Sequence, residues 1–186
     1  MENLDSPTTM PASAPPPYWN NVLKYGLYGG VALIVFSLLT YLMDMNMTSI
    51  MAGLLAFAVM LSVAVGTGVI AIQNQRTLDG GYMAFGRAFV IGALAIAVAV
   101  FLSNIWNFLL ITVIDPDYMN RIKEQFVEQW GDNMPEEAMN EVMKGFDEAG
   151  SLGTAAKNLV TGILLNGLIG GLIAAAIGKK SPPMNL

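Results

Sequence analysis

Four long stretches of this 186-residue chain contain no aspartate, glutamate, lysine or arginine. They cover residues 26–43, 50–72, 88–114 and 158–178. At a rise of about 1.5 Å per residue, helices of these lengths extend roughly 27, 35, 40 and 32 Å, against a hydrocarbon core of about 30 Å. Because lipid offers the backbone no hydrogen-bonding partner, each stretch is predicted to cross the membrane as a helix. The predicted fold class is an all-α integral membrane protein.

The composition agrees with a membrane protein and excludes several kinds of site. Hydrophobic residues make up 54% of the chain and charged residues 12%, which is unusual for a soluble domain. The sequence has no cysteine, which excludes disulfides and thiolate chemistry, and no histidine, the commonest metal ligand and general base. A net charge of −5 argues against nucleic acid as a partner, because phosphate binding needs a basic surface. The expected partner is the lipid bilayer.

A single membrane domain with a tail at each end is predicted. Residues 1–19 are rich in proline and lack apolar periodicity, so we expect a disordered cytoplasmic tail. Residues 181–186 form a short C-terminal tail, and residues 20–180 form the domain. Its first span has no small-residue cleavage site after it and is expected to remain as an anchor. The four spans are predicted at about 22–43, 49–72, 83–113 and 156–178.

The distribution of charge predicts which side of the membrane each loop faces. With four spans, both termini lie on the same side. That side carries five basic and three acidic residues, whereas the other carries four basic and eleven acidic residues. Because lysine and arginine are enriched in short cytoplasmic flanks, we expect both termini in the cytoplasm.

Residues 115–150 are the one sizeable polar segment, and their pattern predicts an extracytoplasmic, acidic helical hairpin. Asp115 followed by Pro116 predicts the start of one helix, and Asn133 with Glu136 resembles a capping box for a second. The acidic face is interpreted as a solvated surface rather than a cation site, because no EF-hand loop or Glu-x-x-His pattern is present. Apolar residues recur at steps of three and four in both helices: Met119, Ile122, Phe126, Trp130, Met139, Val142, Met143 and Phe146.

Small residues four apart predict where the spans pack closely. This spacing lets two helix backbones approach each other in a membrane. It occurs in the first, second and fourth spans, in the pairs Gly26 and Gly30, Ala64 and Gly68, and Gly167 and Gly171.

The polar residues inside the spans cannot carry charge. Proton-coupled transporters usually mark their route with ionisable residues, so the composition of the spans argues against such transport. Asn104, Asn107 and Asn166 are the intramembrane amides of interest. Asn104 and Asn107 share a helical face and either line a polar pocket or, more commonly for such residues, hydrogen-bond to a neighbouring helix.

Methionines surround the first outer loop, at Met43, Met45 and Met47. Thioethers are soft ligands suited to Cu(I), so extracytoplasmic copper binding is one interpretation. Methionine also fills irregular hydrophobic interfaces, and alternating methionines in a short loop are weakly specific. We prefer the packing interpretation and expect no metal or other cofactor.

The stretch DGGYMAFGRAF, residues 79–89, precedes the longest apolar run and predicts an anchor at the membrane interface. Its aspartate and glycines suit a turn, and its aromatic rings suit the level of the lipid head groups. Arg87 lies one turn inside and is expected to reach back to lipid phosphates or to Asp79. An anion or head-group site formed by Arg76 and Arg87 is the alternative. The predicted interface anchors are Tyr82, Phe85, Arg87, Phe89 and Trp106.

Four stretches of the chain resemble sequences of a known family: KYGLYGG, QNQRTLDGGYMAFGRAFVIG, IDPDYMNRI and GLIGGLIAAAIGKK. Over about residues 22–180 the chain resembles an uncharacterised bacterial family of small membrane proteins, domain of unknown function 4199. The second stretch is the most specific, whereas AAKNLVTGILL departs from the proline and acidic residues expected before the last span. The resemblance implies a four-helix membrane protein, and it brings no known activity, substrate or catalytic residue. We expect a multi-pass protein of the bacterial inner membrane.

Two functions fit these observations. The first is a non-enzymatic scaffold or accessory subunit, whose acidic hairpin and small-residue faces would meet a membrane-protein partner or a second copy of the chain. The second is a channel or facilitator for a small solute, suggested by the three asparagines. An enzyme is less expected than either, because the carboxylates of the hairpin lie on an exposed face without an evident partner group.

Overall fold

The protein, in a computed structural model, is described over residues 17–45 and 48–180. Most of the predicted N-terminal tail and all of the predicted C-terminal tail, 181–186, lie outside these residues, and the first helix already begins at Trp19. The described part is helical and contains no β-strand, apart from one isolated antiparallel bridge between Met83 and Lys180.

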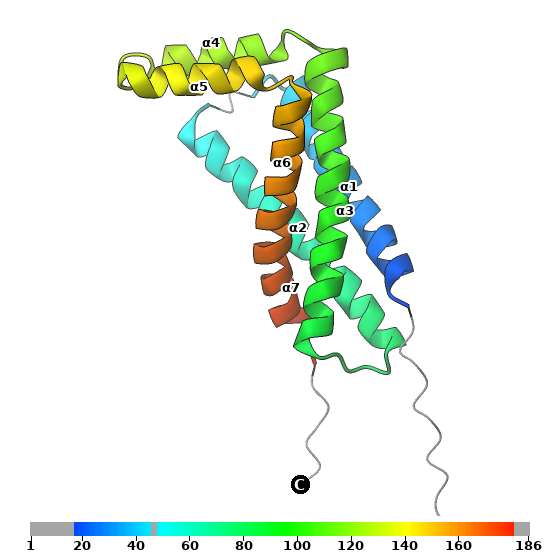
Figure 1. Cartoon of the computed structure of the whole chain (residues 1–186). Helices are drawn as coiled ribbons and strands as arrows, with labels where there is room; N and C mark the ends of the chain where they lie inside the picture. Colours follow the sequence, from blue (N-terminus) through cyan, green and yellow to red (C-terminus); the bar gives the residue numbers. More distant parts are fainter. Residues whose placement is uncertain (1–16, 46–47, 181–186) are drawn as a thin grey trace, which may run out of the picture.

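Four helical segments are long and apolar enough to cross a membrane, which confirms the predicted fold class. The hairpin joins the third span to the fourth at one end of the bundle, and α1 begins and α7 ends at the other (Figure 1). We call these the hairpin end and the terminal end. The spans are α1 (Trp19–Leu42), α2 (Ile50–Leu78), α3 (Phe85–Leu109) with the π-helical segment η1 (Leu110–Ile114), and α6 (Leu152–Leu165) with the π-helical segment η2 (Asn166–Gly170) and α7 (Gly171–Gly178).

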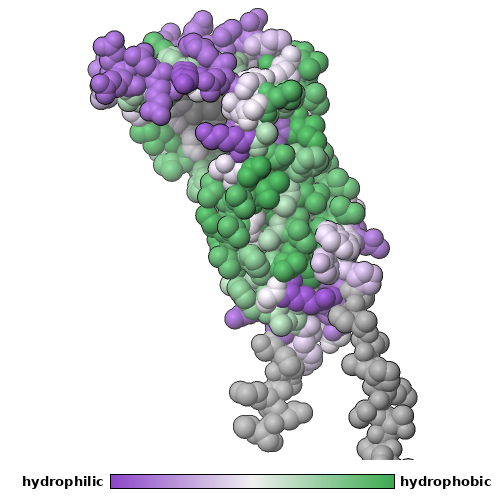
Figure 2. Space-filling model, in the orientation of Figure 1, coloured by the Kyte–Doolittle hydropathy of each residue, from purple (hydrophilic) through white to green (hydrophobic). Residues whose placement is uncertain are grey.

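The core of the bundle lies around α3, towards the terminal end. α3 packs against α1, α2 and α7, and the side chains of Ile72, Ile91 and Ile96 are fully buried between these helices. Large apolar side chains cover much of the outer surface of the spans, where they form a hydrophobic band (Figure 2). Such a surface is stable in contact with lipid acyl chains, so burial in this protein depends on small residues at the helix crossings.

Three of the glycines predicted to pack closely lie at such crossings. A β-carbon on Gly26 would lie 2.6 Å from Cβ of Val98, and one on Gly30 would lie 2.7 Å from a methyl carbon of Leu102. These contacts join α1 to α3. In the same way, a β-carbon on Gly68 would lie 2.8 Å from Cβ of Ala174, which joins α2 to α7.

The other predicted small residues differ in how tightly they pack. A β-carbon on Gly171 would lie 3.0 Å from Cβ of Ala93, whereas one on Gly167 would meet its nearest atom, the Ala93 carbonyl oxygen, at 3.7 Å. Gly167 therefore has ordinary van der Waals space around it. Ala64 is buried with Ile96 and Val100.

The second helix is long and strongly tilted. It was expected to end near residue 72, but it continues to Leu78. The turn that follows contains Gly80 and Gly81, whose φ angles are 84° and 90°. Glycine adopts these angles without the steric cost that a side chain would bring. Towards the hairpin end α2 leans away from α6 (Figure 1).

The predicted helical hairpin is present as α4 (Tyr118–Trp130) and α5 (Glu136–Glu148), which lie side by side across the hairpin end (Figure 1). Phe126 and Phe146 pack edge to face between them, with ring centroids 5.7 Å apart. All eight residues of the predicted apolar stripes are half-buried, while the glutamates of the opposite face are exposed.

Both predicted helix starts in the hairpin were wrong. α4 begins at Tyr118, because Asp115 and Pro116 form a preceding turn in which the Asp115 carboxylate is bonded to other side chains. α5 begins at Glu136, after Pro135. The backbone N–H of Asn133 instead donates to the Trp130 carbonyl, so Asn133 belongs to the turn that ends α4.

Candidate functional site

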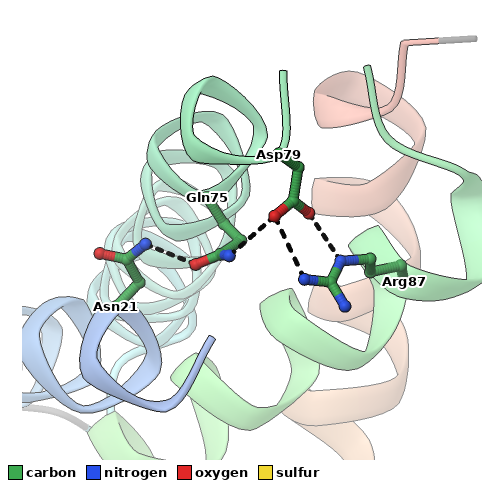
Figure 3. A network of polar contacts seen from close by, with 4 residues as sticks. All are labelled: Asn21, Gln75, Asp79 and Arg87. Atoms are coloured by element: carbon green, nitrogen blue, oxygen red, sulfur yellow. Dashed lines mark hydrogen bonds and ion pairs between the residues drawn. The ribbon is translucent and has the colours of Figure 1, made fainter. Parts of the chain in front are cut away.

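A network of polar side chains connects α1, α2 and the start of α3 at the terminal end (Figure 3). Arg87 donates from Nε to Oδ2 of Asp79 at 2.6 Å and from Nη2 to Oδ1 at 3.2 Å. Gln75 donates from Nε2 to the same carboxylate at 3.0 Å and accepts from Nδ2 of Asn21 at 2.6 Å. We call Asn21, Gln75, Asp79 and Arg87 the terminal-end network.

The terminal-end network satisfies polar groups that are removed from solvent. The side chain of Gln75 is fully buried, and those of Asp79 and Arg87 are 7% and 28% exposed. A buried carboxylate is tolerated only when charge and hydrogen bonds compensate its lost hydration. Arg87 was expected to reach lipid phosphates or Asp79, and in the structure it pairs with Asp79.

Two further contacts close the terminal end. Arg76 donates from Nη1 to the carbonyl oxygen of Gly178 at 2.8 Å, joining α2 to the end of α7. Met83 and Lys180 exchange backbone hydrogen bonds of 2.8 and 3.1 Å. Both arginines of the predicted anion site therefore already have protein partners, and an anion held between them would compete with Asp79 and with the Gly178 carbonyl.

The predicted aromatic anchors occupy different environments. Tyr82 and Phe85 are exposed, and each lies beneath a lysine: Lys180 Nζ is 5.7 Å from the centroid of Tyr82, and Lys179 Nζ is 5.6 Å from that of Phe85. Phe89 instead packs against the buried core.

Trp106 lies between two spans. Its indole Nε1 donates to Oγ of Ser37 on α1 at 3.2 Å. The predicted interface anchors therefore include one residue that also connects two helices and one that also fills the core.

We expect Arg87→Met to lower the free energy of unfolding by about 3–5 kcal/mol, the range observed when one partner of a buried ion pair is removed. The substitution leaves the Asp79 carboxylate nearly buried without its counter-charge. Thermal unfolding in detergent micelles measures the effect, and Lys24→Met, at an exposed position, is the control. Adding Asp79→Asn to Arg87→Met should recover part of the loss. Equal effects of Arg87→Met and Lys24→Met would contradict a stabilising role for the network.

An intramembrane cleft lies nearer the hairpin end, between α2 and the other spans. One cavity of about 340 Å³ is lined by α1, α2, α3 and Tyr118, and a smaller one of about 130 Å³ continues from it towards α6. Leu33, Met60 and Ser103 line both cavities, so we treat the two as one intramembrane cleft. Its polar residues are Ser37, Thr40, Ser103, Asn104, Asn107, Tyr118 and Asn166.

The three intramembrane asparagines hydrogen-bond to their own helices. Asn104, Asn107 and Asn166 donate from Nδ2 to the carbonyl four residues earlier, at 2.9, 2.8 and 2.9 Å. For Asn104 and Asn107 the preferred interpretation, a bond to a neighbouring helix, was wrong, because the preceding turn of the same helix offers a nearer acceptor. Asn107 lines the larger cavity, and Asn104 and Asn166 line the smaller one.

The hairpin is fixed to the spans by side-chain contacts. Tyr41 donates to Oδ2 of Asp115 at 2.9 Å, and Arg121 approaches the same atom at 2.5 Å. This guanidinium holds the pKa of the Asp115 carboxyl below its ordinary value, so the pair is fully formed at neutral pH and is lost only as the pH falls through that lowered pKa. Near the other end of α4, Trp130 Nε1 donates to the Thr48 carbonyl at 3.1 Å.

The candidate metal sites receive no support from the described residues. No group of three histidine, cysteine, aspartate or glutamate side chains there could hold an ion. Met43 is exposed beyond the end of α1, and Met47 lies outside the described residues. Copper binding at the methionine loop stays an untested prediction.

Sequence reasoning missed Asn21 and Gln75. Both lie outside the charge-free stretches that guided the search for intramembrane polar residues. The signal that could have found Gln75 is its spacing, since it lies four residues before Asp79 and therefore on the same face at the end of α2. Asn21 comes close to Gln75 only through the packing of α1 on α2.

These features define a class: a four-span helical membrane protein with a polar hairpin at one end of the bundle and a buried polar network at the other. Residues 24–180 match the family described as "Protein of unknown function (DUF4199)", and the chain belongs to this family. The match confirms the resemblance seen in the sequence. No curated protein and no solved structure matches the chain.

Proposed function

We propose that the protein is a non-enzymatic scaffold or accessory subunit of the bacterial inner membrane, with both termini in the cytoplasm and the hairpin outside. The observation that carries the proposal is the fixed position of the hairpin, which projects past the edge of the bundle (Figure 1). A rigid, charged platform beside uncharged spans is suited to holding a partner in place.

The attachment of the hairpin supports this proposal. Contacts at both ends of α4, through Asp115 and Trp130, join it to α1 and to Thr48 in the loop just before α2. The ion pair between Lys123 and Asp147, 2.6 Å long, holds α5 against α4. The acidic surface therefore keeps one orientation relative to the membrane, which lowers the entropic cost of binding.

The chemistry of the exposed surfaces suggests the partner. Glu124, Glu128, Glu137 and Glu141 are exposed on the hairpin and have no ion-pair partner among the described residues. They favour a membrane protein with a basic surface outside the lipid, because complementary charge steers association and fixes its orientation. A second copy of the chain is equally acidic here, so a contact between hairpins is not favoured.

The scaffold proposal is tested by placing two lysines on the hairpin, Glu124→Lys with Glu128→Lys. The matched control is Asn74→Lys with Thr77→Lys, which places two lysines on exposed positions at the terminal end. After extraction in mild detergent, we expect a partner that co-purifies with the unaltered chain to be retained by the control and reduced at least tenfold by the hairpin variant. Equal retention by both variants, or no partner in several mild detergents, would contradict the proposal.

The channel or facilitator is the second candidate, favoured by the asparagines of the cleft. The tight packing towards the terminal end argues against it, because the fully buried side chains of Ile72, Ile91 and Ile96 fill the space between the spans there. Flux of a small uncharged solute into proteoliposomes that contain only this protein would favour the channel over the scaffold.

A further inference from the structure

The intramembrane cleft is open to the bilayer on one side. α2 packs against α1, α3 and α7, but it makes hardly any contact with α6. Near the hairpin end the two helices diverge (Figure 1), and the surface on this side is hollowed beneath the hairpin (Figure 2). Small residues of α2, Gly53 and Ala56, line the cleft there. A molecule dissolved in the membrane can therefore enter between α2 and α6.

The cleft is closed towards the hairpin. Tyr118, the first residue of α4, lines it, and the tyrosine ring packs edge to face on Tyr41 with centroids 5.4 Å apart. Tyr41 is in turn bonded to Asp115, so the contacts that fix the hairpin also fix this roof. Entry from lipid is favoured over entry from water.

The lining offers hydrogen-bond acceptors that the described protein does not use. Asn104 and Asn166 each donate from Nδ2 to a carbonyl of their own helix. Within the described part of the chain, their Oδ1 oxygens accept no hydrogen bond. Asn104 lies about 15 Å along the helix from Ile114, which ends the third span, so it is well inside the hydrocarbon region. An amide oxygen without a partner is costly there, and a bound donor would relieve that cost.

The charge and size of the cleft restrict what can bind. Among the described residues, no aspartate, glutamate, lysine or arginine lines either cavity, so a charged head group would find no counter-charge. The two acceptors line the smaller cavity, about 130 Å³, and the larger one beside it, about 340 Å³, is within the range of small-molecule sites, about 300–1,000 Å³. The π-helical segment η2 begins at Asn166, and such segments often occur at functional sites.

From this geometry we infer that the cleft is a binding site for a neutral lipid alcohol, an amphiphile with a hydrocarbon tail and an uncharged hydroxyl head. The tail lies along the apolar part of the cleft, where Leu33 and Met60 line both cavities. The single proton of the hydroxyl is donated to Oδ1 of Asn104 or to Oδ1 of Asn166, both of which line the smaller cavity. This site goes beyond the scaffold function and does not depend on it.

The inference is tested with two lipids of the same acyl chains, one with a hydroxyl donor and one in which an acetyl ester replaces it. 1,2-Dioleoylglycerol carries a free hydroxyl, and 1,2-dioleoyl-3-acetylglycerol lacks it. Binding to the delipidated full chain is measured by native mass spectrometry from detergent micelles. We expect at least a tenfold preference for the free alcohol. Equal binding of the two lipids, or displacement of dioleoylglycerol by an equal concentration of dioleoylphosphatidylglycerol, would overturn the inference.

Substitutions locate the site. Asn104→Leu and Asn166→Leu remove the acceptors while keeping the branched shape of the side chain, and each should reduce the preference for the alcohol towards unity. Asn158→Leu is the matched control, because Asn158 is exposed on the same helix as Gly162 and lines neither cavity. A preference that persists in both cleft variants, or that is lost equally in the control, would contradict the assignment. Thermal unfolding identifies any variant that fails to fold, and the two-lipid comparison on the unaltered chain does not depend on the variants.

Discussion

Gly68→Leu should lower the free energy of unfolding by about 3 kcal/mol or more, while Gly66→Leu, two residues away on the same helix, should change it little. A β-carbon on Gly68 would lie 2.8 Å from Cβ of Ala174 and 3.2 Å from Cδ1 of Ile96, whereas no atom of a neighbouring helix lies within 4 Å of one on Gly66. Inserting atoms into a well-packed core typically costs about 1–3 kcal/mol and occasionally more. We expect the cost of a leucine at the crossing of α2, α3 and α7 to lie at or above the upper end of this range, because several helices must move.

Thermal unfolding in the same detergent, followed by tryptophan fluorescence, measures both variants against the unaltered chain. The fourth span provides a second pair for comparison. Gly171 lies close to the backbone of Ala93, and Gly167 has more space, so Gly171→Leu should cost more than Gly167→Leu. If Gly66→Leu destabilised the protein as much as Gly68→Leu, close packing at the crossing of α2 and α7 would not be the source of stability.

The large features of the fold could be predicted because they depend on local sequence and on the bilayer. Four charge-free stretches predict four spans, since lipid tolerates few other structures for such segments. The hairpin follows from apolar residues at helical spacing, and its stripes do face inward. The contact between Arg87 and Asp79 was within reach of sequence reasoning, because the two residues are eight apart across a turn that contains two glycines.

The features that sequence reasoning missed depend on tertiary geometry. The start of α4 was placed too early, because Asp115 looked like a helix cap, whereas its carboxylate is used by Tyr41, 74 residues away. The tilt of α2, which opens the cleft, has no signature in hydrophobicity, since all faces of a lipid-exposed helix are apolar. The spacing of Gly167 and Gly171 predicted close packing at both positions, and only the crossing geometry shows that Gly171 packs more tightly than Gly167.

The orientation in the membrane leads to an all-or-none prediction with single cysteines. The chain has no cysteine of its own, so Thr77→Cys and Asn140→Cys each introduce one thiol. Both positions are exposed, Thr77 in the last turn of α2 at the terminal end and Asn140 in α5 of the hairpin. In intact cells, with any outer membrane permeabilised, a membrane-impermeant maleimide should label position 140 fully. Position 77 should react only after the inner membrane is opened.

The physical reason for this expectation is the difference between the two ends of the bundle. Lys24, Arg76, Arg87, Lys179 and Lys180 lie in short flanks at the terminal end, while most of the acidic residues of the chain lie in the hairpin. Basic residues in short flanks are retained on the cytoplasmic side, whereas acidic residues have little influence on orientation. The reverse labelling pattern would invert the protein and turn the acidic hairpin towards cytoplasmic partners. Only the third span lies between residues 77 and 140. Labelling of both positions in intact cells would therefore mean that the third span does not cross the membrane.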